Sequence, residues 1–170
     1  MSRQGSDLFA ADLLLESSIP LPASYLRQAE ALGLTTAQVV AFRSIVMGEQ
    51  GPQLVEVKAV DAAYPLRGRL HVRDGYDAPE RVVTAGPPQG QVWIESRLLL
   101  LLDTRLGAQV GLGALRLTLG AILGEELDRG AAVFALAPRV MMNLEDLAGT
   151  GLITEASRAA PEPLPGYKPP

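Results

Sequence analysis

The sequence predicts an α+β fold in which strands outnumber helices. Residues 54–60 alternate between apolar and polar side chains, with Glu56 and Lys58 on one face, and this period-two pattern is typical of a half-buried strand. The stretch 39–47 is rich in β-branched and aromatic residues, and the turn signal GEQGP at 48–52 lies between the two segments. We therefore expect the two segments to pair as a β-hairpin.

The elements before this hairpin complete a β-α-β-β unit. Three consecutive leucines within residues 11–18 stand shortly before Pro20 and Pro22, and so short an apolar run favours a buried strand over a helix. Residues 23–32 have apolar positions at helical spacing, and Gly33 supplies a helix end. We expect this helix to cover one face of a sheet that is built from the three strands.

The second half of the sequence predicts shorter strands and short helices. The loop AGPPQG at 85–90 is the best internal boundary, and the last twelve residues are rich in proline. The expected elements are strands at 69–73, 92–94, 115–123 and 131–137, helices at 95–107 and 138–147, and an exposed turn at 125–130. We thus divide the chain into an α/β part at 1–86, a smaller β-rich subdomain with short helices at 87–157, and a tail at 158–170.

Composition excludes several classes of function. The chain has 170 residues, of which 48% are hydrophobic, and its net charge of -4 argues against a nucleic-acid partner. It has no cysteine and one histidine, so thiolate catalysis and multi-histidine metal sites are excluded. No signal peptide and no apolar run long enough to span a bilayer is present, so the chain as given is expected to be soluble.

No catalytic constellation emerges from the residues. His71 lies within an alternating strand and is expected to face solvent, and no serine stands in a G-x-S-x-G motif. The carboxylates of Glu125–Glu126 and Glu145–Asp146 are adjacent in sequence, so each pair diverges on a helix or strand. Neither Gly-x-Gly occurrence opens a long helix after a strand. We expect no enzymatic activity, no cofactor and no metal.

Two long motifs carry a resemblance to a known family. They are V-K-A-V-D-x-x-Y-P-L-R-G at 57–68 and L-A-P-R-V-M-M-N-L-x-D-L-x-x-T-G-L-I at 136–153, with LFAADLLLESSIPLP at 8–22 before them. In this order they resemble the extracytoplasmic (periplasmic) domain of permeases of the MacB/FtsX-like superfamily of ABC transporters, of the YbbP type. The resemblance covers roughly residues 7 to 157.

The resemblance implies a non-catalytic domain on the extracytoplasmic face of the bacterial inner membrane. The family's permeases have four transmembrane helices, and an ATPase subunit on the cytoplasmic side drives motion that reaches the outer domain. That domain has a porter-like α/β part, which the β-α-β-β unit would form incompletely here. The implied partners are the permease transmembrane helices, the ABC ATPase indirectly and an extracytoplasmic esterase. We also expect a homo-oligomer, because an incomplete sheet would leave apolar side chains of residues 39–47 or 13–15 uncovered.

The candidate site is the segment Tyr64, Pro65, Leu66, Arg67 and Gly68. Its structural interpretation is a bend, in which Pro65 fixes φ, Gly68 permits a turn and Arg67 pins the loop by bonding backbone carbonyls. Its functional interpretation is a contact for substrate or a partner protein. The alternative to a permease domain is a free-standing binding module that holds a lipid or acyl ligand in an apolar groove.

Overall fold

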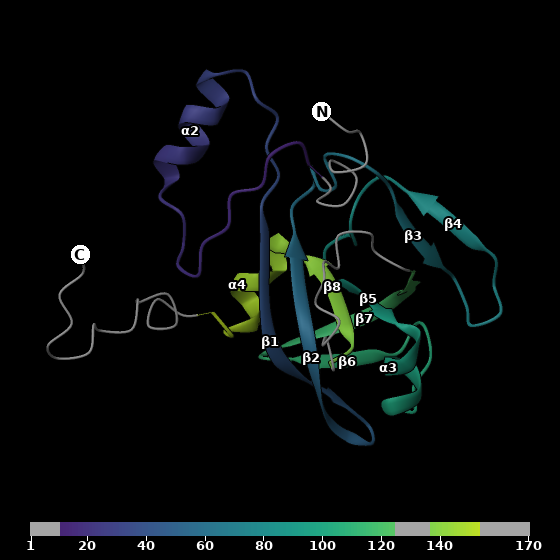
Figure 1. Cartoon of the computed structure of the whole chain (residues 1–170). Coiled ribbons are helices and arrows are strands. Elements are labelled where there is room, and N and C mark those ends of the chain that lie inside the picture. Colours follow the sequence, from purple (N-terminus) through teal and green to yellow (C-terminus); the bar gives the residue numbers. More distant parts are fainter. Residues whose placement is uncertain (1–10, 125–136, 154–170) are drawn as a thin grey trace, which may run out of the picture.

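The computed structural model describes residues 11–124 and 137–153 and shows a sheet-rich domain with few helices (Figure 1). The elements are α2 (Ala23–Ala31), β1 (Val39–Gly48), β2 (Gly51–Val60), β3 (Leu70–Arg73), β4 (Glu80–Val83), β5 (Gln91–Glu95), α3 (Ser96–Leu101), β6 (Gln109–Leu112), β7 (Leu115–Leu123), β8 (Arg139–Asn143), the 3₁₀ turn η2 (Leu144–Asp146) and α4 (Leu147–Thr150).

The sheet closes on itself. Its strand order is β4-β3-β7-β5-β8-β2-β1-β6, and β6 pairs with β7 as well as with β1. The strands β7, β5, β8, β2, β1 and β6 therefore form a closed ring, from which the β3–β4 hairpin extends at β7 (Figure 1). Within the ring β8 runs parallel to β2 and antiparallel to β5.

Two apolar clusters lie on the two faces of this sheet, because successive side chains of a strand point in opposite directions. Val140 and Met142 belong to a large cluster that collects residues from all six ring strands, so this cluster fills the ring. Met141 points the other way and joins a smaller outer cluster, in which Trp93 and Tyr64 also lie. The outer cluster packs beside the β3–β4 hairpin and carries the candidate segment.

Several predicted elements are confirmed. β1 and β2 pair antiparallel over their whole length, from Val39 opposite Val60 to Gly48 opposite Gly51, as the hairpin prediction required. The helix predicted at 23–32 is α2, and Gly33 follows it with a φ of +70°. The strands predicted at 69–73, 92–94 and 115–123 correspond to β3, β5 and β7.

The strand predicted at residues 11–18 is wrong, as is the covering role of the helix. Residues 11–18, all of which are described, form no strand, and Leu13 is 81% exposed. None of the nine residues of α2 is buried, and in Figure 1 the helix stands apart from the strands. A short apolar run indicates burial only if the tertiary structure supplies a neighbour, and these leucines have none that buries them.

Two helix predictions are also wrong in extent or type. The helix predicted at 95–107 ends at Leu101, and Asp103 then takes a left-handed φ of 46°, which a continuing helix does not allow. Residues 139–143 form β8 rather than a helix. Val140, Met141 and Met142 are all fully buried, and a strand in the interior of a sheet buries both of its faces in this way.

Some expectations concern residues outside the described ranges. The turn at 125–130, residues 131–136 of one predicted strand and the tail at 158–170 belong to this group. The porter-like grouping of the first strands and the division at residue 86 stay predictions. In the described sheet β1 and β2 have β6 and β8 as their outer neighbours.

Candidate functional site

The candidate segment begins at a turn that Asp61 organises directly after β2. The Asp61 carboxylate accepts hydrogen bonds from the backbone N–H groups of Gln38 (2.7 Å) and Ala63 (3.0 Å). The Tyr64 N–H donates to the Asp61 carbonyl oxygen at 3.2 Å. Aspartate favours such turns because its short side chain reaches its own downstream backbone. The Asp61 carboxylate thus fixes the direction in which the chain leaves the ring.

Tyr64 anchors the segment to the outer apolar cluster. Its side chain is 5% exposed, and Lys58 of β2 is equally buried. The Lys58 Nζ donates to the Tyr64 Oη at 2.5 Å and lies 4.5 Å from the centroid of the ring. A buried ammonium group requires such polar and cation–π contacts, because desolvation of an uncompensated charge is costly.

The next residues turn the chain outward. The Tyr64–Pro65 peptide bond is cis, and Pro65 and Leu66 are half-buried. Gly68 has a φ of +74°, a conformation that side-chain-bearing residues rarely adopt. The turn predicted at Gly68 is therefore confirmed, whereas nothing in the sequence predicted the cis bond.

Arg67 links this loop to the segment that precedes α2. Its Nε lies 3.0 Å and its Nη2 2.6 Å from Oδ2 of Asp12, and the Nε also lies 3.2 Å from Oδ1. The sequence prediction had named backbone carbonyls, whereas the partner that the structure shows is a carboxylate. Both side chains are more than half exposed, at 56% and 62%. The loop thus has a buried inner anchor and an exposed outer one.

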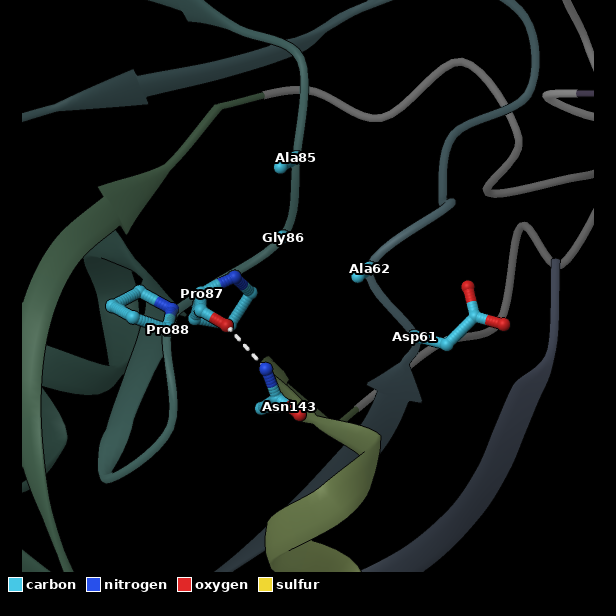
Figure 2. Close-up of a pocket in the computed structure, with 7 residues that line it drawn as sticks. All are labelled: Asp61, Ala62, Ala85, Gly86, Pro87, Pro88 and Asn143. Carbon is cyan, nitrogen blue, oxygen red and sulfur yellow. Dashed lines mark hydrogen bonds between the residues drawn. The ribbon is translucent and has the colours of Figure 1, made fainter.

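A hollow of ≈ 290 Å³ lies beside the Asp61 turn (Figure 2). Figure 2 shows Pro87 facing Ala62 across it, with Asn143 at one side, while the Asp61 carboxylate points away. The hollow is lined by Asp61, Ala62, Ala85, Gly86, Pro87, Pro88 and Asn143. Apart from Asp61 and Asn143 these are small or apolar residues, so the hollow suits an apolar group.

Asn143 holds one wall of the hollow in place. Its Nδ2 donates to the Pro87 carbonyl oxygen at 3.1 Å, and its Oδ1 accepts from the Glu145 N–H at 3.0 Å. Asn143 is thus the N-cap of the 3₁₀ turn η2 that follows it. The Gln89 side chain donates to the Glu145 carboxylate, and the Gly90 N–H donates to Asp146 at 2.7 Å. The adjacent acids Glu145 and Asp146 thus bind the 85–90 loop.

Two further contacts between titratable groups lie on the β3–β4 hairpin. His71 is half exposed on β3, as predicted, and its Nδ1 lies 2.6 Å from a carboxylate oxygen of Glu80 on β4. On the same hairpin Arg81 donates two hydrogen bonds to Asp74, at 2.7 and 2.8 Å. These bonds, more than the attraction between the charges, lower the pKa of Asp74, while desolvation acts in the opposite direction.

Two other kinds of feature are absent from residues 11–124 and 137–153. Among them no group of three or more His, Cys, Asp or Glu side chains is arranged to hold a metal ion. Within the same residues no helix is long and apolar enough to cross a bilayer.

Sequence reasoning missed three contributors to the site, namely Asp12, Asp61 and the burial of Lys58. Two of them had a signal. A single lysine among apolar residues at 57–60 indicates a charged group inside a buried strand, and an aspartate directly after a strand is a turn signal. Asp12 had none, because its partner Arg67 is 55 residues away.

Comparison with known proteins points to a class of membrane transport proteins. No protein-family model matches the chain. A curated relative is an ABC transporter permease, and 32% of residues are identical over 158 aligned positions. This relative is the uncharacterized ABC transporter permease YbbP of Escherichia coli (strain K12). The match covers 93% of this chain but 19% of the relative, which is consistent with a domain of such a permease.

Proposed function

We propose that this chain is an extracytoplasmic domain of a MacB/FtsX-like ABC transporter permease. In this role it relays ATP-driven motion across the membrane and contacts substrate or a partner protein, without catalysing a reaction. The observation that carries the proposal is the 32% identity over nearly the whole chain to an ABC transporter permease. The partners of the domain would be the permease transmembrane helices, the ABC ATPase indirectly and an extracytoplasmic esterase.

The non-catalytic part of the proposal is supported by how the polar side chains are used. The carboxylates of Asp61, Glu145 and Asp146 accept hydrogen bonds from backbone or amide groups of neighbouring loops. His71 contacts Glu80 on a projecting hairpin, away from the hollow. These groups hold loops against the closed ring, which favours a rigid body that transmits force over a site that transforms a substrate.

The proposed extracytoplasmic location of the domain can be tested in a chimeric permease. This chain would replace the matching segment in a cysteine-free version of the Escherichia coli relative. Leu100→Cys places a thiol at a position that is 70% exposed, and Leu98→Cys is the matched control because Leu98 is fully buried in the same helix. A membrane-impermeant maleimide should label the Leu100→Cys variant in intact cells and the Leu98→Cys variant only after denaturation. Labelling of Leu100→Cys only after lysis would contradict the extracytoplasmic location.

Relay of motion can be tested in the same chimera after purification with its ATPase. Spin labels at Leu14→Cys and Gln109→Cys report the distance between the segment before α2 and β6 of the ring. We expect the distance distribution to change when the ATPase is trapped with ATP and vanadate. An unchanged distribution in a complex that hydrolyses ATP would contradict the relay.

One observation favours a second candidate, a binding module for a short acyl ligand. The apolar hollow of ≈ 290 Å³ is close to the lower end of ligand pockets, which measure about 300–1,000 Å³. Titration calorimetry with octanoate tests this function. Binding that is lost in Ala62→Trp, which fills the hollow, and retained in Ala114→Trp, at an exposed turn position, would support it. An absence of heat at two well-separated temperatures in the unmodified chain would exclude octanoate as a ligand, because burial of its apolar surface changes the heat capacity.

A further inference from the structure

The outward edge of β1 is open over one continuous stretch. β1 pairs with β2 at every position, but in the described part of the chain it pairs with β6 only at Val46 and Met47. Among the described residues, 39–45 thus have ladder bonds on one side alone, towards β2. The register between β1 and β2 is uninterrupted, so no bulge turns this edge away. The stretch VVAFRSI also has no lysine or proline, two residues that often protect an edge strand, and Arg43 is its one charged residue.

The backbone geometry shows which groups this edge presents. The Gln38 carbonyl oxygen accepts from the Asp61 N–H across the hairpin, so the polar backbone groups of Gln38 face β2. Backbone direction alternates along a strand, and those of Phe42 therefore also face β2. The N–H and C=O groups of the odd-numbered residues, among them Ala41 and Arg43, point to the open side.

We propose that this edge pairs with the same edge of a second copy of the chain, in an antiparallel arrangement about a two-fold axis at Phe42. The open stretch 39–45 is centred on Phe42, so pairing about this residue alone uses the full edge of both copies. It places Arg43 opposite Ala41 of the second copy, and the outward backbone groups of both residues become hydrogen-bonded. A two-fold axis at Arg43 would instead set two like charges opposite each other, which is unfavourable.

The side chains support the same register. Pairing about Phe42 sets Ile45 opposite Val39 of the second copy, and these side chains are 51% and 43% exposed in the single chain. Both lie on the outer face of β1, where they would cover each other. Leu54, which is directly opposite Ile45 on β2 and 56% exposed, extends this apolar surface. The closed contact is isologous, so it yields a dimer rather than a fibre.

Light scattering of the purified chain tests the existence of the pair. We expect twice the 18.0 kDa mass of one chain at micromolar concentration. Ala41→Pro removes an outward N–H and should return the mass to that of one chain, whereas Ala41→Ser keeps the N–H and should leave the dimer intact. A chain that is monomeric in its unmodified form overturns the proposal.

Disulfide trapping tests the register, and the cysteine-free chain makes every crosslink attributable. Val40 of one copy would lie opposite Ser44 of the other as a pair without ladder bonds, with Cα atoms about 4.5 Å apart, within disulfide reach. Under mild oxidation we expect crosslinked dimer when Val40→Cys and Ser44→Cys chains are mixed, and none from either alone. Crosslinking of a single variant, or none in a mixture that remains dimeric, refutes this register. The inference does not depend on the proposed function.

Discussion

The ammonium group of Lys58 donates a hydrogen bond of 2.5 Å to the hydroxyl of Tyr64 and lies 4.5 Å from the centre of the same ring. This contact joins β2 of the closed ring to the first residue of the candidate loop. Because both side chains are buried, water does not replace a contact that is removed. The pair is therefore the inner anchor of the loop, whereas the exposed Arg67–Asp12 pair is the outer one.

Removal of the Tyr64 hydroxyl should destabilise the fold. In Tyr64→Phe the buried Lys58 loses one acceptor, and we expect the free energy of unfolding to fall by about 1–3 kcal/mol. Tyr64→Ala also removes the ring from the outer cluster and should cost about 3–5 kcal/mol. Tyr76→Phe is the matched control, because Tyr76 is exposed. Urea unfolding measures all three, and equal stability of Tyr64→Phe and the unmodified chain would refute the anchor.

A substitution at Gly86 tests how tightly one wall of the hollow packs on β2. A Cβ atom at this position would lie 2.5 Å from a methyl carbon of Val60, closer than real Cβ contacts allow. We expect Gly86→Ala to lower the free energy of unfolding by about 1–3 kcal/mol, the usual range for overpacking. At Gly75 the nearest atom would be at an ordinary 3.5 Å, so Gly75→Ala is the control. A stable Gly86→Ala variant would mean that the wall moves freely.

The Arg67–Asp12 pair should contribute little to global stability. Exposed ion pairs contribute about 0–1 kcal/mol, so Arg67→Gln should change the free energy of unfolding by no more than that. The remaining effect should decrease in about 1 M salt, where the Debye length is about 3 Å. The exchanged pair Asp12→Arg with Arg67→Asp should restore what Arg67→Gln loses. A loss of several kcal/mol would show that Arg67 holds buried groups instead.

The Asp74 carboxyl should titrate below its ordinary value of 3.8, because Arg81 donates hydrogen bonds to its ionised form. A folded-state pKa below the unfolded one stabilises the fold above the unfolded value. This contribution is lost as the pH falls through the folded value. Residue-resolved NMR titration should show the Asp74 pKa rising towards 3.8 in Arg81→Gln. An identical Asp74 titration in both proteins would exclude Arg81 as the cause.

The purified chain should not hydrolyse acyl esters. No serine of the sequence stands in a nucleophile motif, and His71 is engaged with Glu80 on the β3–β4 hairpin. A chromogenic p-nitrophenyl ester is a suitable substrate, with buffer as the blank. Turnover that disappears in His71→Ala would contradict the non-catalytic proposal.

Local sequence patterns were sufficient to predict features that are formed by residues close together in the chain. The alternation at 54–60 and the turn at 48–52 predicted the β1–β2 hairpin, and helical spacing before Gly33 predicted α2. The turn at Gly68 was also predicted, since a positive φ depends on a few neighbouring residues. Each of these features depends mainly on residues that are close together in the sequence.

Only the tertiary structure decided what requires partners distant in sequence. The segment at 139–143 could form a helix or a strand by composition. It became β8 because β2 and β5 pair with its two edges and the two apolar clusters bury its two faces. The leucines at 13–15 met no such neighbours and stayed exposed. The Asp12–Arg67 contact and the closure of the ring through β6 join residues that are far apart along the chain. A sequence pattern records the burial that a segment requires, and the fold alone determines which partner provides it.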